Sequence, residues 1–186
     1  MTKTDDKTIH VEERGLIKEI RAHVRDVPDF PVPGVLFRDI TPLLAEPELM
    51  RAVIDVLAAK YRGQGIGAVV AIEARGFLFG LPLALVLDCP FVPVRKPGKL
   101  PAATRHIDYS LEYGTAGLEI HDDAIQPGTR VVIVDDLLAT GGTSQAAGRL
   151  VHQLHGDVAG FAYVIELTEL HGREQLDAPV YSLLQL

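Results

Sequence analysis

The chain has 186 residues, of which 47% are hydrophobic and 23% charged, and its formal net charge is -7 at pH 7. This length and composition are typical of one compact globular domain, which we expect to span residues 1–186. The acidic balance argues against a protein that wraps a nucleic-acid backbone. Cys89 is the single cysteine, which excludes an intrachain disulfide and fits a reducing compartment, so we expect a cytoplasmic protein.

The N-terminal part of the chain predicts two helices separated by a loop. We expect residues 1–8 to be frayed, and apolar residues at helical spacing predict an amphipathic helix over 9–27. Pro28, Pro31 and Pro33 end this helix, so residues 29–39 should form an extended loop. Pro47 should begin the second helix, and Gly63 marks its end.

Beyond this point, short apolar strands alternate with helices. The expected strands cover 66–72, 91–94, 131–134, 158–165 and 181–184, and the expected helices cover 77–87 and 143–155. The apolar stretch 77–94 contains Asp88 and several prolines, which favours a buried helix and strand over a membrane span. The polar stretch 96–113 should be a loop or a partly ordered flap. The alternation predicts an α/β fold with a mainly parallel central sheet flanked by helices.

The most informative segment is 131–143, which reads VVIVDDLLATGGT. A buried strand leads through two acids into a turn rich in glycine and threonine, and a helix follows. Ligands of open parallel sheets bind outside the carboxyl ends of the strands, and a helix N-terminus offers amides and a positive dipole to a phosphate. Gly141 and Gly142 allow close approach of the backbone, while Thr140 and Thr143 can donate hydroxyl hydrogens.

The two acids in this segment point to a second part of the same ligand. Asp135 and Asp136 would be repelled by a phosphate, but carboxylates accept hydrogen bonds well from two neighbouring sugar hydroxyls. A ribose 5-phosphate satisfies both the acids and the turn. No Gly-Lys-Ser/Thr follows, so the turn is not a Walker loop. An ordinary capped strand–helix turn is the alternative.

Basic residues near two other strand ends are candidates for a diphosphate. Arg75, in the turn 73–76, could grip a diphosphate through two charge-assisted hydrogen bonds, or it could be a surface arginine in a solvated turn. Arg95, Lys96 and Lys99 form a basic cluster in an acidic chain, which could bind pyrophosphate or be a solvated charge run.

Three further features have both a functional and a plain structural interpretation. Phe37 on the proline-rich loop could stack on a base or pack into the core. Glu112 lies in a polar, tyrosine-containing stretch that could close as a lid, where a carboxylate would suit proton exchange with a bound ligand; it could also be a surface residue of a mobile loop. His152 and His155, at helical i, i+3 spacing, could bind a metal, but a solvent-facing pair is favoured.

The segment 131–143 resembles the signature with which type I phosphoribosyltransferases bind phosphoribosyl pyrophosphate (PRPP). Alone it would indicate only that superfamily. Four further motifs narrow the resemblance to the adenine phosphoribosyltransferases, and they read PDFPVPGVLFRD over 28–39, EARGFLFG over 73–80, RKPGKLP over 95–101 and YSLEYG over 109–114. The resemblance runs from about residue 28 to the C-terminus.

The resemblance implies a reaction of purine salvage, in which adenine and PRPP give AMP and pyrophosphate. It implies a type I phosphoribosyltransferase-like fold with a small hood, a base-binding loop over 28–39 and a flexible catalytic loop over 96–114. It also implies a homodimer and Mg²⁺ that is held mainly by the substrate, with no direct protein ligand. A phosphoribosyltransferase for another base and a non-catalytic PRPP-sensing regulator are the alternatives. We expect neither nucleic acid nor membrane as a partner.

The resemblance also implies roles for individual residues. The ribose and 5-phosphate of PRPP are assigned to Asp135, Asp136, Ala139, Thr140, Gly141, Gly142 and Thr143. Pyrophosphate is assigned to Glu73, Ala74, Arg75, Arg95, Lys96 and Lys99, with a cis peptide between the first two. The base is assigned to Leu36, Phe37, Arg38 and Leu167. Glu112 and Arg75 are the expected catalytic residues.

Overall fold

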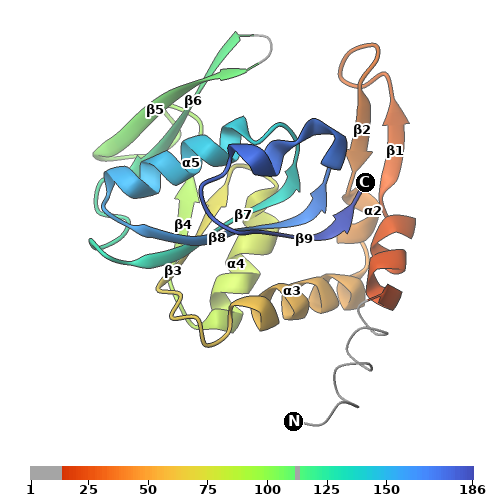
Figure 1. Ribbon diagram of the computed structural model, residues 1–186, viewed down its shortest axis with the longest axis horizontal. Coiled ribbons are helices and arrows are strands. Elements are labelled where there is room, and N and C mark those ends of the chain that lie inside the picture. The colour runs from red at the N-terminus through yellow and green to blue at the C-terminus, as the bar shows by residue number, and fades with distance from the viewer. Residues whose placement is uncertain (1–13, 112–113) are drawn as a thin grey trace. The chain divides into compact units, whose positions relative to one another are not determined.

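The computed structural model describes residues 14–111 and 114–186, which belong to two compact units, Met1–Ile54 and Asp55–Leu186. Figure 1 labels the helices and strands. The helix α3 (Pro47–Tyr61) contains the boundary between the units and has the expected start and end. No helix in the described ranges is long and apolar enough to cross a membrane.

The first unit differs from the sequence prediction. Its first helix covers only 14–22 of the described residues, and the antiparallel strands β1 (Arg25–Pro28) and β2 (Leu36–Asp39) follow it. The expectation of a helix to residue 27 and an extended loop over 29–39 was therefore wrong. Cross-strand pairs explain the difference: Arg38 Nη1 lies 2.5 Å from Asp26 Oδ1, a contact that a helical hydrophobic pattern cannot reveal. A short helix, α2 (Thr41–Leu44), comes next.

The second unit contains a five-stranded, fully parallel sheet, as expected. Its strands are β3 (Ala68–Ile72), β4 (Phe91–Val94), β7 (Arg130–Leu138), β8 (Asp157–Glu166) and β9 (Val180–Gln185). They lie in the order β4-β3-β7-β8-β9. The middle strands are nearly continuous apolar runs because helices and a hairpin cover both faces of the sheet.

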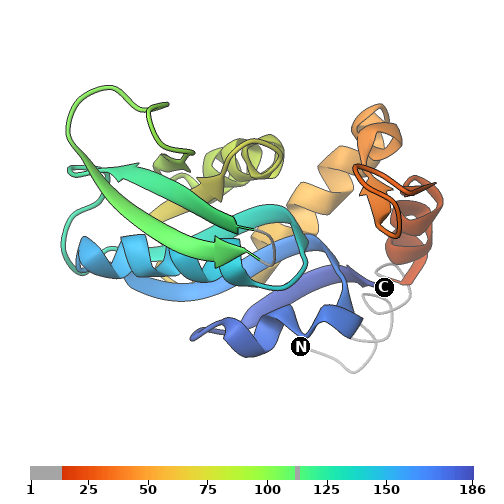
Figure 2. The same ribbon diagram turned by 90° about the horizontal axis from the view of Figure 1, so that it is seen from above.

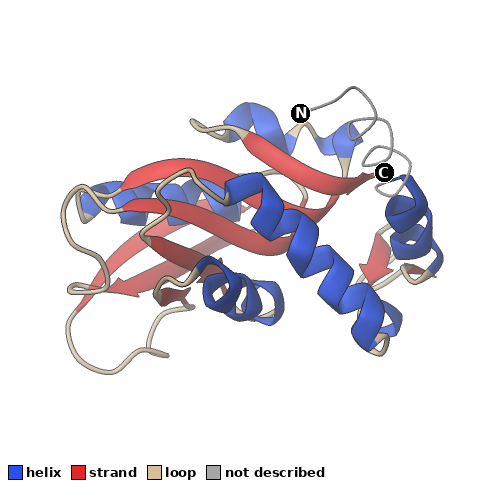
Figure 3. Ribbon diagram, turned by 90° about the horizontal axis from the view of Figure 1, so that it is seen from below, coloured by secondary structure: helices blue, strands red, loops and turns tan. Residues whose placement is uncertain are grey.

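Helices α4 (Gly76–Leu87) and α5 (Gly142–Gln153) lie on opposite faces of this sheet, as Figures 1 and 3 show. The buried residues of α4 are Gly76, Phe79, Gly80, Leu83 and Ala84, which recur at helical spacing. However, Leu78, Leu81 and Leu85 of the same helix are exposed. The expectation of a wholly buried helix was thus wrong for one face of α4.

Part of the stretch 96–113, which we expected to be a loop or a partly ordered flap, belongs to a two-stranded antiparallel hairpin, β5 (Thr104–Leu111) and β6 (Gly114–His121). Its inner face is apolar: Ile107 pairs with Leu118, and Tyr109 and Ile120 belong to the same side of the pleat. This face packs on α5 (Figure 2). The alternation of these apolar residues with polar ones is typical of a half-buried strand.

The strand order places a ligand-binding position at one edge of the sheet. The connection β3 to β4 runs in one direction along the sheet and the connection β4 to β7 in the other, so the order reverses between β3 and β7. Open α/β sheets bind ligands at the carboxyl ends of two such strands. A ligand site is therefore expected at the turns after β3 and β7.

Candidate functional site

The carboxyl ends of β3 and β7 bring together Arg75 and Asp136. Asp136 is only 3% exposed, and its Oδ2 lies 3.1 Å from Nε of Arg75. Asp135 Oδ1 accepts a hydrogen bond of 2.9 Å from the backbone N–H of Asp136. The acids lie inside β7 and not after it, because the strand continues to Leu138. The structure thus places an arginine from one predicted motif on an acid from another.

Burial sets the electrostatics of the two acids. Desolvation raises the pKa of Asp135 well above its usual range, and the neighbouring charge of Asp136 raises it further. Desolvation also raises the pKa of Asp136, while the Arg75 guanidinium acts in the opposite direction. Carboxyl oxygens that are buried away from solvent can accept hydrogen bonds from the hydroxyls of a ligand.

The turn after β7 lines a small cavity at the N-terminus of α5. The cavity encloses about 90 Å³, and its lining consists of Asp135, Leu137, Leu138, Ala139, Thr140, Gly141, Gly142, Thr143 and Ser144. Gly141 is the N-cap residue of α5 and has a φ of +88°. Since glycine has no side chain to cap the helix, it cannot satisfy the first amides of α5 as serine or aspartate would. The five residues that we expected at a 5-phosphate thus share one cavity with Asp135.

The hairpin contributes Tyr109 to this turn. The Tyr109 hydroxyl lies 3.1 Å from Oγ1 of Thr143, the second residue of α5. The sequence suggested that Tyr109 could cover a ligand as part of a lid, but it did not indicate this contact. The alternation of Ile107 and Tyr109 with polar residues is the signal that could have revealed an inward-facing tyrosine.

Gly76 is a site residue that the sequence analysis overlooked. A Cβ at this position would lie 2.8 Å from the carbonyl oxygen of Val134 and 2.9 Å from Oδ1 of Asp135. Glycine therefore permits the first turn of α4 to lie directly against the end of β7. Its place immediately after Arg75 in the sequence was the available signal.

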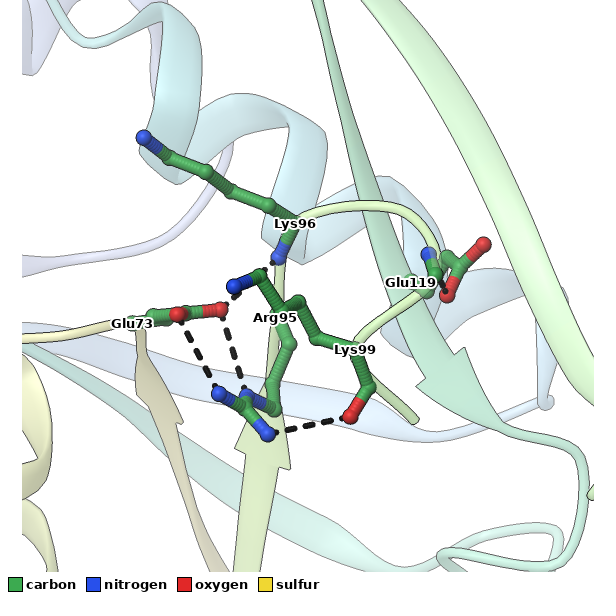
Figure 4. A network of polar contacts seen from close by, with 6 residues as sticks. Glu73, Arg95, Lys96, Lys99 and Glu119 are labelled. Carbon is green, nitrogen blue, oxygen red and sulfur yellow. Dashed lines mark hydrogen bonds and ion pairs between the residues drawn. The ribbon is translucent and has the colours of Figure 1, made fainter. Parts of the chain in front are cut away.

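Glu73, Arg95 and the following loop form one polar network, which Figure 4 shows. The Arg95 guanidinium donates to both carboxylate oxygens of Glu73, each at 3.2 Å, and to the carbonyl of Lys99 at 3.0 Å. The Lys96 N–H donates to Glu73 at 3.1 Å. These interactions, with that of Arg95 foremost, lower the pKa of Glu73. The Glu73–Ala74 peptide bond is cis.

This network separates the three basic residues that the sequence grouped together. Arg95 is engaged with Glu73 and holds the turn after β3 to the loop after β4. In contrast, the side chain of Lys96 extends away from the network (Figure 4). The loop is tied to the hairpin as well, because Glu119 Oε2 accepts from Gly98 N–H at 3.1 Å.

The residues expected at the base lie in both units. In the first, Leu36 is 46% exposed, Phe37 packs edge-to-face on Phe30 with ring centroids 5.0 Å apart, and Arg38 pairs with Asp26. In the second, the Leu167 N–H donates to the Leu138 carbonyl at 2.9 Å. Glu112 lies outside the described residues.

His152 and His155 are both exposed, as the sequence indicated. Nε2 of His152 lies 3.0 Å from Oδ2 of Asp177. Within residues 14–111 and 114–186, no three His, Cys, Asp or Glu side chains cluster in a way that could hold a metal ion.

Comparison with known proteins gives a consistent family. The sequence family described as phosphoribosyl transferase domain matches residues 39–186. The adenine phosphoribosyltransferase of Sorangium cellulosum is 54% identical over 173 residues, which cover 90% of this chain and 86% of the relative. That of Chloroflexus aurantiacus is 55% identical over 169 residues, covering 90% and 98%.

Solved structures agree with the sequence matches. The crystal structure of adenine phosphoribosyltransferase from Thermoanaerobacter pseudethanolicus has a TM-score of 0.89 at 51% identity and covers 91% of this chain and 99% of its own. The Saccharomyces cerevisiae enzyme, complexed with an imino-altritol bisphosphate and adenine, has a TM-score of 0.87 at 42% identity with the same coverage. The match of fold and of sequence over most of the chain shows that it belongs to the phosphoribosyltransferase family, among the adenine phosphoribosyltransferases.

Proposed function

We propose that this chain transfers the 5-phosphoribosyl group of PRPP to adenine and releases pyrophosphate and AMP. The observation that carries the proposal is the meeting of Arg75, the acids of β7 and the glycine-rich turn at one sheet edge. A ligand with a diphosphate, two sugar hydroxyls and a phosphate matches these three features. Adenine as the acceptor rests on the relatives, which are named for it.

The ribose 5-phosphate is assigned to β7 and the turn that follows it. Asp135 and Asp136 accept hydrogen bonds from the ribose hydroxyls, and the backbone of residues 139–143 surrounds the phosphate at the start of α5. Tyr109 supports this arrangement through its hydrogen bond to Thr143. Holding the sugar at both ends orients the anomeric carbon for displacement.

The pyrophosphate is assigned to the turn 73–76 and to the basic loop. Arg75 can donate to a diphosphate, since its side chain remains 41% exposed while it contacts Asp136. Lys96 and Lys99 supply further positive charge. Arg95 acts by holding Glu73, and with it the Ala74 peptide, in place.

Chemistry at the base is assigned to Leu36, Phe37, Arg38, Leu167 and Glu112 on the strength of the family resemblance. Phe37 provides an aromatic face and Leu167 an apolar side chain for a purine ring. Glu112 exchanges the proton that adenine must lose when its ring nitrogen bonds to the sugar.

Mg²⁺ is the implied cofactor, and when bound it would supply the positive charge that a departing pyrophosphate needs. The residues present fit such an ion if the substrate holds most of its ligands. The carboxylates nearest the site, Asp135 and Asp136, form a pair and not a cage of three or more. A magnesium ion with few protein ligands is common when phosphates coordinate it.

We further infer that the protein is a homodimer in the cytoplasm. The exposed leucines of α4 support a homodimer, because a row of large apolar side chains on one helix face is typical of an interface. The unpaired thiol of Cys89 suits a reducing compartment.

One assay tests the proposed activity. AMP formation from adenine and PRPP is followed with Mg²⁺ and with excess chelator, in the wild type and in Asp136→Asn. We expect product only with Mg²⁺. We expect kcat/KM to fall about tenfold or more in the variant, since a charged hydrogen bond is worth about 1.5 to 3 kcal/mol. Arg62→Met, a change at an exposed arginine away from the site, is the control. Unchanged kinetics in Asp136→Asn would refute the assignment.

A further inference from the structure

A buried acid behind the turn 139–143 is held by an arginine that the reaction does not use. Glu166, the last residue of β8, is 2% exposed. Arg173 donates to its two carboxylate oxygens at 2.6 and 2.5 Å, and Ser182 donates to Oε2 at 2.5 Å. The pairing with Arg173 lowers the pKa of Glu166. The acid is therefore ionised, and a buried ionised carboxylate needs its partners.

The residue beside Arg173 lies against the turn 139–143. Arg173 belongs to a short helix, η2 (Gly172–Gln175), and Gly172 is buried. A Cβ at Gly172 would collide with the carbonyl oxygen of Ala139, and a Cβ at Gly141 would collide with the carbonyl oxygen of Gly172. Gln145 of α5 donates to the carbonyl of Gln175 at 2.9 Å. The η2 segment is thus the back wall of the turn.

We propose that Arg173 is a positioning residue for the 5-phosphate: by pairing with Glu166 it presses Gly172 against Ala139 and Gly141, and so fixes the shape of the turn. The inference rests on the proposed function, in which that turn binds the 5-phosphate. Two points of attachment define the geometry. One is the bidentate pair at Glu166, whose fork allows little rotation, and the other is the close backbone contact at Gly172.

The position of the pair makes it more than a device for neutralising a buried acid. Any cation within reach could satisfy Glu166, but the one present is adjacent in sequence to the residue that packs on the turn. The ion pair links Glu166, at the end of β8, to Arg173 in η2. Loss of the pair would therefore release Gly172 before it disturbed the sheet.

The test measures ribose 5-phosphate and pyrophosphate separately. Dissociation constants for ribose 5-phosphate, and for pyrophosphate with Mg²⁺, are determined calorimetrically for the wild type, Arg173→Met and Arg173→Lys. We expect Arg173→Met to weaken ribose 5-phosphate about tenfold, with pyrophosphate changed less than twofold. Arg173→Lys should recover part of the loss, since it keeps the charge without the fork. In steady state, KM for PRPP should rise while KM for adenine stays the same.

Two further variants keep the test decisive if Arg173→Met fails to fold because it leaves Glu166 unpaired. The double variant Glu166→Gln with Arg173→Met removes both charges and should show the same selective loss. Gly172→Ala disturbs the contact without changing any charge, and we expect it to weaken ribose 5-phosphate at least as much. Gly15→Ala is its control, because a Cβ at Gly15 meets nothing within 4 Å.

The outcomes separate this inference from the proposed function. If Thr143→Val and Gly142→Ala leave ribose 5-phosphate binding unchanged, the phosphate is not bound at the turn and the proposed function is wrong there. If those variants weaken binding but the Arg173 and Gly172 variants do not, the proposed site stands and the positioning role of Arg173 is refuted. An equal loss of both ligands would refute it too, since that indicates general destabilisation.

Discussion

The hydroxyl of Tyr109 lies 3.1 Å from Oγ1 of Thr143, so a hairpin residue reaches the helix start at which we place the 5-phosphate. Tyr109→Phe removes only this hydroxyl. A neutral hydrogen bond contributes about 0.5 to 1.5 kcal/mol, so KM for PRPP should rise about two- to tenfold. Steady-state kinetics at saturating adenine measure this.

The matched control for Tyr109→Phe is Tyr61→Phe. The Tyr61 hydroxyl donates to the Phe161 carbonyl at 3.3 Å within the core. That variant should lose some stability and keep its KM. Equal KM values for Tyr109→Phe and the wild type would show that the contact has no part in PRPP binding.

The buried acids make stability depend on pH in a direction that can be worked out. Because burial raises the pKa of Asp135 in the folded state, the folded protein holds a proton there at pH values at which the unfolded chain has lost it. Stability from this group is therefore greatest at low pH and falls as pH rises from the ordinary aspartate pKa through the raised one. Asp135→Asn should be more stable than the wild type at neutral pH and lose that advantage on acidification.

Calorimetry or differential scanning fluorimetry between pH 4 and 8, a range that begins near the ordinary aspartate pKa, tests this prediction. In a chain of this size, about 1 kcal/mol shifts Tm by about 2 to 4 °C. The same variant should lose activity, so stability and function change in opposite directions. A variant less stable than the wild type at neutral pH would contradict the burial argument.

The exposed face of α4 gives a prediction about assembly. Leu85 is 74% exposed, although every residue of α4 is apolar. If this face is a dimer interface, Leu85→Glu places a charge in it without a partner, and the protein should become monomeric. Analytical ultracentrifugation at micromolar concentration reports the change. Gln153→Glu adds the same charge at an exposed position on α5 and should leave the assembly unaltered.

Base choice tests the family assignment independently of the sheet-edge site. We expect kcat/KM for adenine to exceed that for hypoxanthine and guanine by at least about a hundredfold. A 6-oxo base presents donors and acceptors in the reverse order and leaves buried polar groups unpaired. Comparable turnover of hypoxanthine would favour a phosphoribosyltransferase for another base.

Elements with a strong local signal were predictable from the sequence. The parallel strands of the second unit are short apolar runs, which few structures other than a buried strand would explain. Helix α3 has a start signal at Pro47 and an end signal at Gly63. The candidate site was predictable as far as it lies in contiguous motifs. The turn 139–143 is an example, because its glycines and threonines are adjacent in sequence and line one cavity.

Contacts between distant segments were not predictable. The pair of Arg75 with Asp136 joins residues 61 positions apart and depends on the parallel neighbours β3 and β7. The strands β1 and β2 were not predicted, because they are stabilised by a pair between Asp26 and Arg38, which lie on opposite sides of the turn. The hairpin depends on the pairing of β5 with β6 and on the packing of its apolar face on α5. In each case the deciding interaction lies outside the window in which local periodicity operates.

The close contacts of Gly141 and Gly172 place main-chain groups directly behind the cavity that follows β7. Every residue except proline carries the same peptide N–H and C=O groups, so most point mutations can displace these groups but cannot change them. A site built this way is difficult to retune for a different ligand and easy to destroy. New specificity in such a protein would have to arise where side chains meet the substrate, which we propose for Leu36 and Phe37, while the phosphate end stays constant.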